Sequence, residues 1–107
     1  MAEAREVAPH KLKDTEVRQR FNRAVEDYRK KYPGYKIEPT WRTPTKCEVK
    51  LKLSPMLALN AVVTLSPGYL VFVVSYPDAF RFYKSEIGEY VVAFRNEVQK
   101  YLGPAAP

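Results

Sequence analysis

A chain of 107 residues with 46% hydrophobic side chains has the size and apolar content of one domain. The longest apolar run, residues 69–74, is far shorter than the roughly 20 residues of a membrane-spanning helix, and the first ten residues contain no apolar signal segment. We therefore expect a cytoplasmic protein. Cys47 is the single cysteine, which excludes an internal disulfide and agrees with a reducing compartment.

The net charge of +6 is distributed unevenly along the chain. Residues 11–52 carry a balance of +7, and the rest of the chain is close to neutral. Such a concentration of positive charge attracts polyanions, so the chain is expected to bind nucleic acid or another acidic partner. Scarce Asn and Gln, together with 9 prolines and 8 tyrosines, favour a thermophilic source.

The first half of the chain predicts a tail, a helix and an extended segment. Residues 1–13 show no periodicity and are expected to form a flexible tail. An amphipathic helix is predicted from Asp14, with Asp14 or Thr15 as its cap, to Pro33-Gly34. Its apolar residues recur at helical spacing: Val17, Phe21, Ala24, Val25, Tyr28 and Tyr32. Prolines 39 and 44 then hold residues 35–45 extended.

The second half predicts strands followed by a helix. Residues 46–53 alternate strictly and predict a strand with one apolar and one basic, solvated face. Residues 59–65 and 69–76 should form a hairpin around Ser66-Pro67-Gly68, and the second face of these strands needs a cover. Residues 80–84 continue either as a short fourth strand or as the first turn of a helix, with Ser85 as a candidate cap and Gly103-Pro104 as its end.

These elements predict an α+β fold. One domain, residues 14–102, should contain an antiparallel sheet of three to four strands with an N-terminal and a C-terminal helix packed on one face. Residues 103–107 are expected to be a second flexible tail.

The sequence offers poor material for catalysis. His10 stands alone in the predicted tail, Cys47 lies on the apolar face of a strand, and the acidic residues mostly accompany Lys or Arg. Metal-ligand spacings and phosphate-binding glycine loops are absent from the sequence. We therefore expect neither an enzyme nor a bound cofactor or metal.

Basic residues interleaved with aromatic ones form the most suggestive pattern. Single-stranded nucleic acid suits this mixture, because bases stack on aromatic rings while cations follow the phosphates. Trp41 and Tyr35 lie outside regular periodicity and are the better stacking candidates, whereas the rings of residues 80–83 could instead anchor the last helix to the sheet. The predicted nucleic-acid-binding residues are Tyr35, Lys36, Trp41, Arg42, Lys46, Lys50, Lys52, Phe80, Arg81, Phe82 and Tyr83.

The element order, the Trp41-Arg42 segment, the strand at 46–53 and the FRFYK stretch at 80–84 carry a family resemblance. Over about residues 14–102 the chain resembles ThermoDBP and its related proteins, a family of small archaeal single-stranded DNA-binding domains. The resemblance implies an aromatic and basic cleft that takes single strands with little sequence preference, and assembly into homo-oligomers. The leucine-zipper extension of ThermoDBP has no counterpart here, so a branch that oligomerises through the domain itself fits better.

Two alternatives remain open at this point. One is a protein-interaction module or inhibitor, of viral origin for example, that presents its basic surface to an acidic protein. The other is a domain similar to double-stranded RNA-binding domains, although the sequence lacks their loop and the lysine cluster that opens their last helix.

Overall fold

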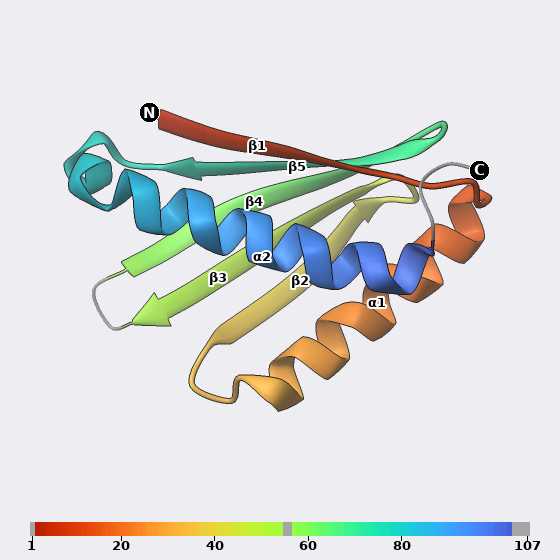
Figure 1. The fold of residues 1–107 in the computed structure, drawn as a ribbon, viewed down its shortest axis with the longest axis horizontal. Coiled ribbons are helices and arrows are strands. Elements are labelled where there is room, and N and C mark those ends of the chain that lie inside the picture. Colours follow the sequence, from red (N-terminus) through yellow and green to blue (C-terminus); the bar gives the residue numbers. More distant parts are fainter. Residues whose placement is uncertain (1, 55–56, 104–107) are drawn as a thin grey trace.

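A computed structural model describes residues 2–54 and 57–103, apart from the side chains of Leu53, Ser54, Leu57 and Arg81. It contains a five-stranded antiparallel sheet with strand order β1-β5-β4-β3-β2, and two helices on one side of that sheet (Figure 1). Along the chain the elements are β1 (Ala2–Pro9), α1 (Asp14–Lys31), β2 (Lys36–Thr43), β3 (Lys46–Ser54), β4 (Leu57–Ser66), β5 (Tyr69–Tyr76), the 3-10 helix η1 (Asp78–Tyr83) and α2 (Lys84–Leu102). The α+β class is confirmed, with five strands in place of the predicted three to four.

The two additional strands lie where the sequence predicted irregular chain. β1 occupies most of the segment predicted to be a flexible tail and pairs along its whole length with β5, so residues 2–9 belong to the sheet. β2 occupies the segment predicted to be extended, with Pro39 in the edge strand of the sheet. β1 carries small alanines where a typical strand carries large apolar residues, and this hides its periodicity. Most of the predicted C-terminal tail lies outside the described residues.

Both helices lie close to their predicted ranges, but neither has the predicted side-chain cap. α1 is preceded by Lys13, and neither Asp14 nor Thr15 provides a side-chain cap. Asp14 instead lies in the first turn, where a carboxylate stabilises the positive end of the helix dipole. The residues predicted to form a fourth strand or a first helical turn form η1, and α2 begins at Lys84 without a cap from Ser85. Gly103 ends α2 with a φ of 84°, which favours glycine.

The core lies between the two helices and the sheet face that they cover. Phe21 of α1, Phe72 of β5 and Phe94 of α2 meet at its centre, with ring centroids 6.1 to 6.4 Å apart. Among the described side chains, the alternating residues of β3, β4 and β5 that point toward the helices are buried. Within residues 2–54 and 57–103 the opposite face of the sheet carries no helix, and we call it the open face.

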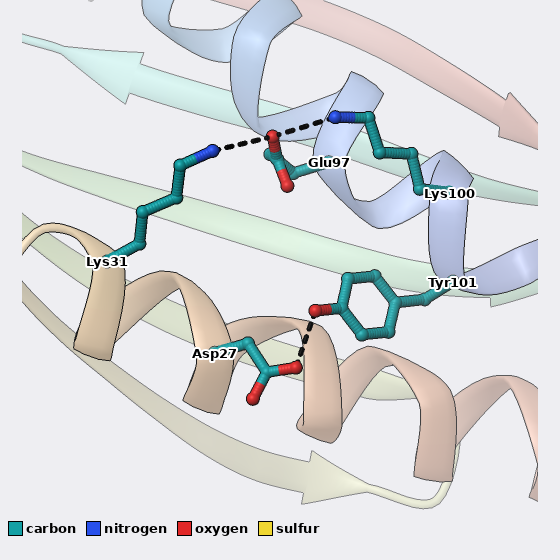
Figure 2. A network of polar contacts seen from close by, with 5 residues as sticks. All are labelled: Asp27, Lys31, Glu97, Lys100 and Tyr101. Carbon is teal, nitrogen blue, oxygen red and sulfur yellow. Dashed lines mark hydrogen bonds and ion pairs between the residues drawn. The ribbon is translucent and has the colours of Figure 1, made fainter.

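Polar contacts join α1 to α2 at the surface (Figure 2). The Tyr101 hydroxyl donates to Asp27 at 2.5 Å, and Glu97 accepts from Lys31 at 3.5 Å and from Lys100 at 3.2 Å. The hydrogen bond from Lys100 is the main reason why the pKa of Glu97 is lowered. The carboxylates of this network therefore offset part of the basic charge of α1.

Candidate nucleic-acid interface

The open face carries the basic side chains of β3. Because side chains alternate across a strand, Cys47, Val49 and Leu51 enter the core while the lysines between and beside them are exposed. Those exposed lysines are Lys46, Lys50 and Lys52. The predicted strand with one apolar and one basic face is therefore confirmed.

The pairing of β2 with β3 gathers three lysines at one end of the open face. Lys36 lies directly opposite Lys52, and Lys50 lies two residues before Lys52 on the same face. We call Lys36, Lys50 and Lys52 the lysine cluster. Glu38 faces Lys50 across the strands, yet within residues 2–54 and 57–103 none of the three lysines has an ion-pair partner within 4 Å. Like charges placed opposite each other are unfavourable, so the cluster is suited to an anion.

Two adjoining depressions lie beside the lysine cluster. The first, about 230 Å³, is lined by all three lysines, by Glu38 and by Asn60 of β4. The second, about 310 Å³, shares Lys50 and Asn60 with the first and continues to Val62. Asn60 adds a polar side chain that can both donate and accept hydrogen bonds at the place where the depressions meet.

The other half of the open face is largely apolar, although it also carries Glu3 and Arg5 of β1. Val62 of β4 and Val73 of β5 are directly paired, and Val7 of β1 lies opposite Val71. Val7 is 39% exposed and Tyr69, at the end of β5, is 42% exposed. The sequence had indicated that this second face needed a cover. The structure shows an apolar half and a basic half side by side on one sheet.

Arg42 and Lys46 extend the basic half toward the other end of β2 and β3. Arg42 Nε donates to a carboxylate oxygen of Glu48 at 2.9 Å, so its charge is partly compensated. Lys46 is exposed, and no ion pair to it is found in the part of the chain that the structure describes.

Trp41 lies on the helix side of the sheet, separate from the lysine cluster. Its ring packs edge-on against Phe21 at 5.9 Å, and its Nε1 donates to Asn22 Oδ1 at 2.9 Å. The Arg18 guanidinium lies 4.5 Å from the centre of the ring. The half-buried Trp41 therefore connects β2 to α1.

Tyr35 is also on the helix side, within a group of tyrosines. Its ring stacks on Tyr32 with centroids 5.6 Å apart and meets the edge of Tyr90 at 5.7 Å. Tyr28 contacts both Tyr32 and Tyr90 in turn. Burial raises the pKa of the Tyr90 hydroxyl well above its ordinary value. The hydroxyl therefore stays neutral, and Tyr90 has a structural role in this group of tyrosines.

The FRFYK stretch lies beyond the end of β5, apart from the lysine cluster. Phe80 packs against the core and meets Tyr83 edge-on at 6.4 Å, as in the alternative in which these rings anchor α2. Phe82 is 82% exposed and Tyr83 is 46% exposed. The Arg81 side chain lies outside the described residues. The structure therefore divides the predicted site residues into three groups: the basic open face, the rings packed beneath β2, and η1.

His10 is not part of a tail, and it is buried at 3% exposure. Its Nδ1 accepts a hydrogen bond from the Leu12 backbone at 3.1 Å, and its own backbone N–H donates to Gly68. Burial lowers the pKa of His10 and raises the pKa of Cys47 to about 11, so both side chains are neutral near pH 7. Among the described residues, no group of three or more His, Cys, Asp or Glu side chains is placed to hold a metal ion.

The sequence did not indicate Asn60 or Tyr69 as site residues. They reach the open face through the pairing of β4 with β5, which a local sequence pattern does not show.

Comparison of the chain with protein-family models, with the sequences of curated proteins and with solved structures gave no match. Neither helix of the described chain combines the length and the apolar character that crossing a membrane requires.

Proposed function

We propose that this protein binds single-stranded nucleic acid, DNA or RNA, with little sequence preference, across the open face of its sheet. The lysine cluster is the observation that carries the proposal. Lys36 and Lys52 face each other across two strands, and among the described residues neither forms an ion pair, although Glu38 lies nearby; a phosphate group would relieve the repulsion between the lysines.

The apolar half of the open face favours a single strand over a duplex. A single strand exposes its bases as well as its phosphates, and bases gain from contact with apolar and aromatic side chains. β3 and β5 are separated by β4, so their axes lie about 10 Å apart. Phosphates at Lys50 and bases over Val62, Val73 and Tyr69 can therefore belong to the same strand.

The remaining candidates take different places in the proposal. Lys46 and Arg42 extend the phosphate path along β2 and β3, while Trp41 and Tyr35 support β2 from beneath. Phe82 and Tyr83 contribute only if the strand continues past the end of β5. We also propose that the chain is related to the ThermoDBP-related domains, because single-strand binding is the activity that the resemblance to that family implies.

The proposal is tested with fluorescence anisotropy of a labelled oligothymidine and of a labelled duplex at several salt concentrations. The variant Lys36→Gln, Lys50→Gln, Lys52→Gln removes the lysine cluster. The matched control Lys13→Gln, Arg23→Gln, Lys30→Gln removes the same charge from exposed positions on or beside α1. We expect the cluster variant to lose at least about tenfold in affinity and to reduce the salt slope by about 2, because each phosphate contact contributes about 0.7.

Two results would contradict the proposal. Equal losses in the cluster variant and the control would mean that net charge alone attracts the oligonucleotide. Competition by polyglutamate at the same charge concentration as the oligonucleotide would favour the acidic protein partner, and partners that survive nuclease in a pulldown would identify it.

A further inference from the structure

The outer edge of β1 is divided into a covered part and a free part. Arg95 Nε of α2 donates to the Val7 carbonyl at 2.8 Å, and Gln99 Nε2 donates to the Pro9 carbonyl at 2.8 Å. The backbone N–H of His10 points the other way and donates to Gly68. Because backbone groups alternate in direction along an antiparallel strand, the odd-numbered residues of β1 direct theirs away from the sheet.

Glu3 and Arg5 therefore present their backbone N–H and C=O groups at the free part of this edge. Within residues 2–54 and 57–103 no backbone or side-chain group pairs with them. An unpaired edge is a template for another strand, and proteins usually protect it. The opposite edge, β2, is protected by Pro39 and by an irregularity between Trp41 and Thr43, whereas residues 2–6 of β1 have neither device.

We infer that residues 2–6 of β1 pair antiparallel with the same residues of a second copy of this chain, around a two-fold axis at Ala4. In this register Glu3 faces the partner's Arg5, and Arg5 faces the partner's Glu3. Glu3 and Arg5 are both exposed on the open face, so each pair brings opposite charges together. The pairing also satisfies the backbone groups of Glu3 and Arg5, since these residues form the hydrogen-bonded positions.

Charge selects this register among its neighbours. A shift of two residues in one direction places Glu3 opposite the partner's Glu3, and a shift in the other direction places Arg5 opposite the partner's Arg5. Both juxtapose like charges and are unfavourable. A shift of one residue places outward-directed backbone groups opposite inward-directed ones, so the ladder cannot form.

The helix side of the same edge leaves room for the second copy. A groove of about 610 Å³ between β1 and α2 is lined by small or apolar residues, Ala4, Gly88, Val92 and Ala93 among them, and also by the charged residues Arg5, Glu6 and Glu89. Val92 is 41% exposed there, and Gly88 and the two alanines leave space beside it, while Glu6 and Glu89 stay at the solvated margin of the contact. A two-fold axis perpendicular to the sheet keeps both α2 helices on one side and brings the two grooves together. The resulting sheet has ten strands, with the Glu3 and Arg5 pairs at its centre and the largely apolar parts of the two open faces on either side.

Charge exchange tests the register by sedimentation velocity over a range of protein concentrations. Arg5→Glu and Glu3→Arg should each raise the dissociation constant of the dimer at least about tenfold, because each places like charges opposite each other twice. The double variant should restore association, and the distant charge reversal Lys30→Glu should leave it unchanged. A chain that is monomeric at all concentrations, or a double variant as weak as the single ones, would overturn the inference.

A cross-link tests the position of the axis. In a Cys47→Ala background, Ala4→Cys places two cysteines at a non-hydrogen-bonded pair, where Cα atoms are about 4.5 Å apart and within disulfide reach. Mild oxidation should give a covalent dimer with Ala4→Cys and monomer with the control Ala2→Cys, which faces the partner's Glu6. Equal or better cross-linking through Ala2→Cys would overturn the proposed register. Because neither experiment uses nucleic acid, both are independent of the proposed function.

Discussion

Helix α1 and the paired strands β2 and β3 are both basic, but they use their charge differently. α1 has six Lys or Arg against four Asp or Glu, and β2 with β3 place five cations and two carboxylates on the open face. Three of the α1 cations, Arg20, Arg29 and Lys31, bond to carboxylates, whereas on the open face only Arg42 does so among the described residues. A count of charges along the sequence therefore does not locate a binding surface. The surface is located by finding which of those charges form ion pairs in the folded structure and which do not.

Replacing Trp41 by Ala should give the largest loss of stability, because this side chain joins the two basic regions. The substitution removes the contact with Phe21 and the hydrogen bond to Asn22, and we expect the free energy of unfolding to fall by about 2 kcal/mol. Chemical denaturation measures this loss. Trp41→Phe, which keeps an aromatic contact, should lose less. A variant that weakens oligonucleotide binding without losing stability would make Trp41 a stacking residue instead.

Replacing Lys36 by Glu should separate binding from stability on the open face. The change turns a like-charge pair with Lys52 into an opposite-charge pair, so the free energy of unfolding should rise by up to about 1 kcal/mol. Oligonucleotide affinity should nevertheless fall about tenfold, since a phosphate contact is replaced by repulsion. Lys30→Glu on α1 is the matched control, and its effect on affinity should be small because salt screens distant charges. Similar losses in both variants would remove the distinction between the two regions.

The pKa of the buried Cys47 thiol should be set by burial in the core and not by the positive charge of the two basic regions. Arg18 of α1 favours the thiolate, but burial outweighs this effect and raises the pKa to about 11. In the unfolded chain the thiol loses its proton near pH 9, so the free energy of unfolding should decrease as the pH rises from 9 toward 11. Denaturation at several pH values, with Cys47→Ala as the reference for all other titrating groups, measures this difference. An identical pH dependence of both proteins would contradict it.

The periodicity of apolar residues correctly predicted those helices and strands in which large apolar side chains repeat along the element itself. The helix from Asp14, the strand at 46–53, the strand at 69–76 and the final helix were all recognisable because large apolar side chains repeat at one period. β1 was not recognisable, because its helix-facing residues are three alanines and Glu6, and because its paired residues in β5 lie between 60 (Pro9 and Tyr69) and 74 (Ala2 and Tyr76) positions away in the sequence. Pairing with a distant strand leaves no trace in a local pattern.

The amino-acid sequence alone determined that one face of β3 is basic, because alternation in a strand is a local property. The tertiary structure decided which cations remain unpaired. Glu97 reaches Lys31 only because α2 packs on α1, 66 residues further along the chain, and Lys36 meets Lys52 only through the register of β2 on β3. It also decided that Trp41 points toward α1, since the side of the sheet covered by the helices is a property of the whole fold.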